Sequence, residues 1–187
     1  MKEYSGLVES GFAYQGQVAD THLALAELDV DEGKFEAAQK SLRAAEAIFN
    51  AKEGPVTERP ARSLALTAKS LLESGRQRQA LALADRALSQ PHPANLRVRL
   101  PIEITRARIL AKSGKQEDVE AALAALQQTA ARAHETFFVL CEWEARLAAA
   151  EIEEDAGRPE AASKLAALAD EANKKEFGRI ATRASRL

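Results

Sequence analysis

Four glycines recur along the chain at nearly constant spacing, and a lysine or an arginine follows each of them at once. They are Gly33, Gly75, Gly114 and Gly157, separated by 42, 39 and 43 residues. An internal repeat of this length is typical of arrays of small helical units. Because glycine adopts positive φ at little cost, each of these residues is predicted to end a helix. The repeat therefore restricts the chain to successive helices joined by similar short turns.

Small side chains keep the same register around each glycine. An alanine stands seven residues before every glycine, and a small or apolar residue stands five and twelve residues after it. These positions are Ala26, Ala68, Ala107 and Ala150 before the glycines, and Ala38, Ala80, Val119, Ala162, Ala45, Ala87, Leu126 and Ala169 after them. Side chains this small let two helices approach closely, so the helices on either side of each glycine are predicted to pack together. Each pair keeps an apolar face that it cannot bury alone, which predicts stacking of successive pairs.

Apolar periodicity and helix-breaking residues predict four helix pairs and a shorter closing helix. The predicted helices are 18–32, 34–50, 59–74, 76–89, 95–113, 115–133, 136–156 and 158–174, with a capping helix at 176–186. Breaks are predicted at 52–55, at 89–93 and near Ala133, and Pro101 is expected to kink the fifth helix or shorten its start.

The domain organisation follows from these spans. Residues 18–187 are predicted to form a single repeat domain, with repeats at about 18–55, 59–92, 95–133 and 136–174. Residues 1–17 contain three glycines and do not complete a pair, so they are predicted to be a lead-in or the remnant of a preceding repeat. A complete protein and a fragment of a longer one both stay open.

The order of small residue, glycine, cation and small residue resembles the tetratricopeptide repeat, over about residues 18–174. The resemblance is clearest in Ala26…Gly33-Lys34-Phe35-Glu36-Ala37-Ala38…Ala45 and in Ala68…Gly75-Arg76…Ala80…Ala87-Leu88. It implies an all-α right-handed superhelix, or solenoid, of four stacked antiparallel helix pairs with a capping helix. This chain has a longer period than the family, lacks its early tryptophan and keeps the aromatic residue after the glycine only as Phe35. It is also similar to helical repeat regions that follow kinase or DNA-binding domains in bacterial multidomain signalling proteins.

Residues that carry catalysis or bind metals are sparse. His22, His92 and His134 lie far apart, and none has a histidine or cysteine at metal-ligand spacing. Cys141 lies in an apolar stretch without a cation close by in sequence, which favours a structural role over a nucleophilic one. Neither a glycine-rich phosphate loop nor a G-x-S-x-G elbow occurs. The sequence therefore predicts a non-enzymatic protein without a cofactor or metal.

Composition predicts a cytoplasmic protein that binds neither membranes nor nucleic acid. No apolar run approaches the ~20 residues of a membrane span, and the start lacks the apolar core of a secretory signal. One cysteine cannot form an internal disulfide, which is the pattern of a reducing compartment. Residues 76–115 hold nine Lys/Arg against Asp85 and Glu103, but the whole chain has a formal net charge of −2. The fifth predicted helix also lacks an aromatic residue on which a base would stack.

The family resemblance implies a ligand face. In such a stack the first helix of each pair lines the concave side, with the residues thirteen, six and two positions before each glycine pointing inward. The candidate groove residues are Glu27, Arg62, Lys69, Glu73, Arg108, Lys112 and Glu151. In one interpretation the cations receive an acidic peptide or a chain-terminal carboxylate. In the other, acids and bases of adjacent repeats pair: Glu27 with Lys69, Arg108 with Glu151, and Lys112 with Glu73 or Asp155.

Two functions are predicted from this face and from the ends of the stack. The first is a protein- or peptide-binding scaffold, as the sensor or docking part of a bacterial signalling protein. The alternative is a self-associating module, in which a second copy covers an open end of the stack near Leu23, Leu25 and Leu28.

The aromatic residues near the start of the seventh predicted helix have two interpretations. Phe137, Phe138 and Trp143 either fill the core between the third and fourth units or expose an anchor for a partner. Core filling is the favoured interpretation.

Overall fold

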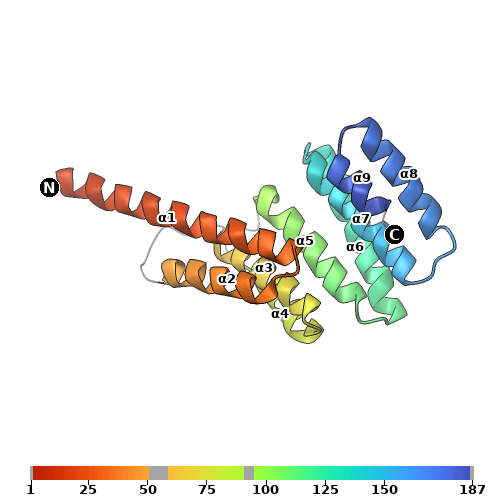
Figure 1. The fold of residues 1–187 in the computed structure, drawn as a ribbon, viewed down its shortest axis with the longest axis horizontal. Coiled ribbons are helices and arrows are strands. Elements are labelled where there is room, and N and C mark those ends of the chain that lie inside the picture. The colour runs from red at the N-terminus through yellow and green to blue at the C-terminus, as the bar shows by residue number, and fades with distance from the viewer. Residues whose placement is uncertain (1, 51–58, 91–94, 186–187) are drawn as a thin grey trace. The chain divides into compact units, whose positions relative to one another are not determined.

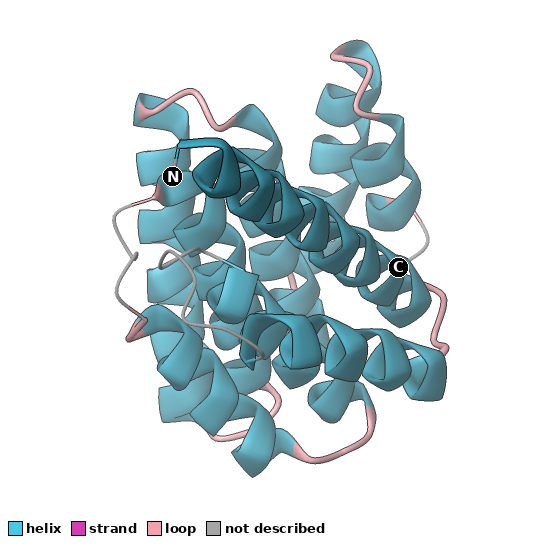
Figure 2. Ribbon diagram, turned by 90° about the vertical axis from the view of Figure 1, so that its left-hand side faces the viewer, coloured by secondary structure: helices cyan, strands magenta, loops and turns pink. Residues whose placement is uncertain are grey.

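The computed structural model describes residues 2–50, 59–90 and 95–185, which form helices joined by short loops and turns (Figure 2). Within these residues nine helices pack in sequential pairs (Figure 1). They are α1 (Lys2–Asp31), α2 (Phe35–Asn50), α3 (Arg59–Glu73), α4 (Gln77–Leu88), α5 (Leu96–Ala111), α6 (Gln116–Glu135), α7 (Val139–Asp155), α8 (Ala161–Lys174) and α9 (Gly178–Ala184). The chain divides into two compact units between Val98 and Arg99, inside α5. The predicted all-α fold of paired helices is confirmed.

The first unit contains the pairs α1–α2 and α3–α4, and α3 also contacts both helices of the first pair. Its central cluster consists of Leu23, Ala26, Leu42 and Ala45, all buried. These residues lie on one face of each helix, at the three- and four-residue spacing of an amphipathic helix. The two alanines are register positions predicted from Gly33, so close packing of this pair is confirmed.

The second unit is organised around α7, which contacts α6, α8 and α9. One face of α7 joins Ile104 of α5 and Leu126 of α6 through a cluster that contains Ala145 and Ile152. The opposite face carries Trp143 and other buried residues into a second cluster with α8 and α9. A helix that is apolar on two faces is one that lies between neighbours.

The turns within the predicted pairs are closed by the four repeat glycines. Their φ angles are 74°, 75°, 72° and 67°, in the left-handed region, as predicted. After three of the glycines the next residue donates its backbone N–H to the carbonyl five residues earlier, as in a Schellman motif. These bonds are Lys34 to Asp29 (2.7 Å), Arg76 to Leu71 (2.9 Å) and Arg158 to Glu153 (3.0 Å).

One of the predicted register positions is wrong. Ala162 is exposed, whereas the residue before it, Ala161, is buried. The reason is that α8 begins at Ala161 rather than at residue 158, after a turn that includes Pro159. The remaining positions around the glycines are buried, including Val119 and Ala169.

Helix α1 is longer than predicted, because it begins at Lys2 rather than at residue 18. A glycine inside a helix costs only about 1 kcal/mol, so three glycines do not end a helix of 30 residues. One of them has a packing role: a Cβ at Gly16 would lie 3.0 Å from Nη2 of Arg59. Helix α5 begins at Leu96, close to its predicted start at residue 95, so Pro101 does not shorten the start of this helix.

The predicted breaks between helices agree with the structure only in part. The break near Ala133 lies later, because α6 continues to Glu135 and the turn follows at Thr136–Phe138. The breaks at 52–55 and 91–93 lie outside the described residues. The capping helix is present as α9 and is shorter than predicted.

Two further turns repeat the glycine geometry without a glycine. Phe137 has φ 60° and Glu176 has φ 64°, and the residue after each donates to the carbonyl five residues earlier at 2.9 Å. A residue with a Cβ is strained in this region by about 1–2 kcal/mol. The α6–α7 and α8–α9 turns therefore store strain that the glycine turns avoid.

Replacing Phe137 with glycine is expected to raise the free energy of unfolding by about 1 kcal/mol, because the strain is relieved and little contact is lost. Phe137 is 87 % exposed. Urea denaturation followed by circular dichroism at low protein concentration measures the change. Glu135→Gly, in the helical backbone two residues earlier, should instead lower stability by up to about 1 kcal/mol. A loss of stability in Phe137→Gly would contradict the strain.

Candidate functional site

Charged side chains of α1 and α3 pair across the first unit. Arg59 donates to both carboxylate oxygens of Asp20, from Nε to Oδ1 at 2.9 Å and from Nη2 to Oδ2 at 2.8 Å. Gly16 lies one turn before Asp20 and leaves room for the guanidinium beside the α1 backbone. The bond from Arg59 lowers the pKa of Asp20 from its usual 3.8. This bidentate pair connects the first helices of two successive pairs.

The predicted groove cations of the first unit, which lie on α3, also pair with carboxylates of α1. Arg62 Nη2 is 3.4 Å from Glu27 Oε2, and Lys69 Nζ is 2.5 Å from Asp31 Oδ1. Lys69 thus pairs with Asp31, and the predicted pairing with Glu27 is wrong. The partner of Lys69 is offset by one helical turn from the expected one, because the placement of the helix axes sets which carboxylate lies opposite. Glu73, the last residue of α3, is exposed.

The second unit repeats this pattern between α5 and α7. Arg108 donates to Glu151, and Lys112 Nζ donates to Asp155 Oδ2 at 2.7 Å. Both pairs are among those predicted for adjacent repeats. Arg183 of α9 donates to the other oxygen of Glu151 at 2.9 Å, so this carboxylate lies between two arginines.

Helix α9 adds further ion pairs to α7, which the sequence did not indicate. Arg183 also donates to Glu144 at 3.1 Å, and Arg179 lies 3.5 Å from the same carboxylate. We define the ion-pair row as these interactions, which join α1 to α3 in the first unit, and α5 to α7 and α7 to α9 in the second. The two partners of each pair lie 32 to 43 positions apart in sequence, so periodicity alone does not determine which residues pair.

The pairs of the row differ in how accessible they are. Lys112 and Asp155 have side chains that are 57 % and 61 % exposed, whereas those of Arg108 and Glu151 are 27 % and 17 % exposed. An exposed pair contributes only about 0–1 kcal/mol, so a competing charge can replace one partner at low cost. Lys112 is therefore the more accessible of these two cations, while Arg108 is held in a more buried arrangement.

The lowered pKa of Asp20 predicts that the folded protein loses part of its stability in acid. Because the folded-state pKa is lowered, the pair stabilises the protein above the unfolded pKa of Asp, and this stability is lost as pH falls through the folded pKa. Asp20→Asn should be less stable than the wild type by less than about 1 kcal/mol at neutral pH, and equal to it in strong acid. Arg59→Gln should reproduce the same convergence. Thermal melts between neutral and acidic pH measure it, and a pH-independent difference would contradict the assignment.

A second charged cluster lies between α5 and α6 and was not singled out from the sequence. The carboxylate of Glu103, only 13 % exposed, accepts from Arg99 Nε at 2.7 Å and Arg132 Nη2 at 2.9 Å. The buried Thr129 hydroxyl lies 3.3 Å from it. One member of the basic middle of the chain, Arg99, is thus held by a carboxylate inside the second unit.

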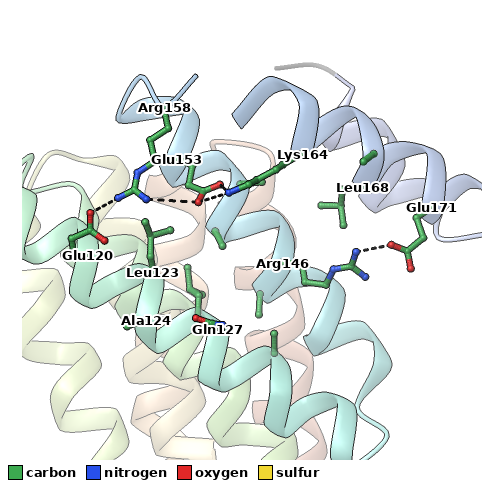
Figure 3. Close-up of a pocket in the computed structure, with 16 residues that line it drawn as sticks. Glu120, Leu123, Ala124, Gln127, Arg146, Glu153, Arg158, Lys164, Leu168 and Glu171 are labelled. Carbon is green, nitrogen blue, oxygen red and sulfur yellow. Dashed lines mark hydrogen bonds and ion pairs between the residues drawn. The ribbon is translucent and has the colours of Figure 1, made fainter. Parts of the chain in front are cut away.

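The α6–α8 groove is a cavity of about 720 Å³ in the second unit (Figure 3). It lies between α6 and α8 over α7, away from the residues that the family resemblance implies. Its lining includes six alanines: Ala124, Ala130, Ala145, Ala149, Ala150 and Ala167. Ion pairs border it, with Arg158 paired to Glu120, Lys164 to Glu153 at 2.8 Å, and Arg146 to Glu171 at 2.6 Å. Alanines at helical spacing were the available signal in the sequence, although buried core alanines give the same signal.

The aromatic residues divide between the two interpretations. Trp143 is 2 % exposed and lies in the core, with its ring centroid 5.4 Å from that of Phe177 and 4.6 Å from the guanidinium carbon of Arg146. Phe137 is instead 87 % exposed, so core filling is wrong for that residue. Phe138 is half-buried.

Cys141 packs against the α5–α7 cluster, and burial raises the pKa of its thiol. Among the described residues, no three His, Cys, Asp or Glu side chains form a group suited to a metal ion. In the same part of the chain, none of the helices is both long and apolar enough to cross a membrane.

Compared with known protein families, with curated proteins and with solved structures, the chain matches none. What the described residues establish is an all-α protein of nine helices packed in sequential pairs.

Proposed function

We propose that the chain is a non-catalytic protein- or peptide-binding scaffold. It is built as a tetratricopeptide-like right-handed superhelix of four helix pairs and a capping helix, and it serves a cytoplasmic signalling protein. Support comes from the four equivalent glycine turns and from the paired packing on either side of them. Such arrays use an extended face rather than a single deep site.

The ion-pair row is the observation that carries the proposal. It contains four candidate cations: Arg62 and Lys69 on α3 in the first unit, and Arg108 on α5 and Lys112 just after it in the second. Each cation already pairs with a carboxylate of the chain, which supports the proposal that these positions accept a carboxylate ligand. An acidic peptide would replace the more exposed internal carboxylates, such as Asp155, and keep the more buried Arg108–Glu151 pair.

Competition between the internal carboxylate and the peptide makes the proposal testable. A labelled glutamate-rich peptide of about ten residues, with a free or an amidated C-terminus, serves as the probe. Lys112→Ala should weaken binding in fluorescence anisotropy, whereas Asp155→Ala should strengthen it because Lys112 is freed. Lys40→Ala, on the exposed surface of α2, is the matched control. If neither variant at the pair alters binding while melting temperatures stay unchanged, the row only joins repeats and the peptide site is excluded.

Self-association through the N-terminal end is the second candidate function. Leu25 and Leu28 of α1 are each about half exposed, whereas Leu23 is buried in the first unit. Two half-exposed leucines at adjacent helical positions form a small apolar surface that a second copy would cover. Light scattering after size exclusion tests this. The N-terminal interface is supported if the mass of the wild type falls on dilution and a variant without these two leucines is a monomer at every concentration.

A further inference from the structure

Helix α9 is held in the second unit by a small contact. It packs against α8 and α7 (Figure 1), and its buried side chains are those of Ile180, Ala181 and Ala184. Two of these three residues are alanines, so detaching α9 exposes little apolar surface to water. A helix of seven residues is also too short to be stable by itself. We therefore expect α9 to separate from the unit at lower cost than the longer helices do.

The turn that joins α8 to α9 opposes its own bend. Glu176 has φ 64°, a conformation that is unfavourable for a residue with a Cβ. Lys175 and Glu176 are exposed and are good helix formers, so they also suit an uninterrupted helix that runs from α8 into α9. In the bent form, Phe177 packs against Trp143 with ring centroids 5.4 Å apart. Tertiary packing therefore holds a bend that the local sequence disfavours.

The surface of α7 under α9 is complementary to one kind of helix. Arg183 donates to Glu144 at 3.1 Å and to Glu151 at 2.9 Å. In the first unit, Arg59 of α3 donates to Asp20 of α1 in the same way, and both arginines lie 39 positions after the carboxylate. Helix α9 thus occupies on α7 a place like that of α3 on α1. The segment that the structure shows to fit this surface of α7 is α9 itself.

We infer that this surface also binds the α9 of a second copy, so that two chains exchange residues 177–184 across a straightened turn. The exchanged dimer keeps the contacts that α9 makes within one chain, and each turn is relieved of the strain at Glu176. Exchange of an identical segment is a low-cost route to a dimer, and a short strained turn favours it. All the elements involved belong to the second unit. The inference therefore depends neither on the peptide site nor on the leucines of α1.

Substitutions at the turn test the exchange. Glu176→Gly relieves the bent form and weakens the straight helix, so it should lower the dimerisation constant about tenfold or more. Glu176→Ala is the matched control: it keeps a Cβ and favours a helix, so it should not weaken dimerisation. Sedimentation velocity of the full chain from about 1 µM to about 1 mM, after the monomer-to-dimer ratio has become constant, measures both. A wild type that stays monomeric, or a dimer that Glu176→Gly does not weaken, would overturn the inference.

A pair of charge variants identifies α9 as the exchanged segment. Glu144→Arg changes α7, and Arg179→Glu/Arg183→Glu changes α9, so each variant places like charges in its own α7–α9 contact. In a mixed exchanged dimer both α7–α9 contacts instead join opposite charges, so mixing should favour the mixed dimer about tenfold or more over either variant alone. Arg76→Glu/Arg78→Glu, the same change of charge at exposed residues of the first unit, is the control partner for Glu144→Arg.

Native mass spectrometry, with one variant of each mixture ¹⁵N-labelled, counts the mixed dimers. The matched mixture should contain them in excess, and the control mixture should not. Equal association in mixed and unmixed samples is the result expected if the leucines of α1 carry the dimer, and it would overturn the exchange of α9.

Discussion

Replacing Trp143 with alanine is expected to lower the free energy of unfolding of the second unit by about 4 kcal/mol, the largest effect of any single truncation considered. The side chain is 2 % exposed and lies in the cluster that joins α7 to α8 and α9. Its loss removes the stacking with Phe177 and the cation contacts from Arg146 and Lys175. Small domains are stable by only about 5–15 kcal/mol, so the change is a large fraction of the total.

Hydrogen exchange of the full chain, read by mass spectrometry alongside urea denaturation, separates the two units in this experiment. Peptides from α7, α8 and α9 should lose protection in Trp143→Ala, and peptides from α1 to α4 should retain it. Leu140→Ala, three residues earlier and mostly exposed, is the matched control and should cost less than about 0.5 kcal/mol. A loss below about 1 kcal/mol in Trp143→Ala would contradict the central position of this residue.

Replacing Glu103 with glutamine is expected to lower the free energy of unfolding by about 2–3 kcal/mol, which is the second large effect. The substitution keeps the shape but removes the charge, which leaves Arg99 and Arg132 close together without their shared counter-ion. The cost is lower than that of a fully buried pair, because both arginines are about one-third exposed. Urea denaturation by circular dichroism measures it.

Two comparisons show whether the Glu103 effect is electrostatic. Asp155→Asn removes a carboxylate from an exposed pair and should cost less than about 0.5 kcal/mol. The double variant Glu103→Gln/Arg132→Leu should lose less than the sum of the two single variants, because it removes the unpaired charge as well. Additive losses would mean that the three groups do not interact as a unit.

The two charged systems of this chain are therefore expected to respond differently to substitution. Glu103 is nearly buried and joins α5 to α6, so its replacement affects folding. The exposed Lys112–Asp155 pair contributes little to folding, and for that reason the proposed peptide site can use it. Stability and binding measurements on the same variants distinguish the two.

Local features of the sequence determined the helix pairs and their turns. Positive φ at a glycine and a hydrogen bond from the following residue involve neighbours in the chain, so spacing alone indicated where Gly33 and Gly157 end a helix. The buried alanines around them followed from helical periodicity for the same reason. Prediction was wrong where a local signal was weak. The glycines of residues 1–17 do not interrupt α1, and Pro159 delays the start of α8.

Only the tertiary structure decided which charges meet and which apolar residues stay exposed. Lys69 pairs with Asp31 rather than Glu27, and Arg183 reaches Glu151 from a helix predicted only as a cap. These partners lie 32 to 38 positions apart, and shifting one helix along another by a single turn would exchange them. The exposure of Phe137 and the groove over α7 likewise depend on how whole helices pack, because an alanine or phenylalanine reads the same in sequence whether a neighbour covers it or not.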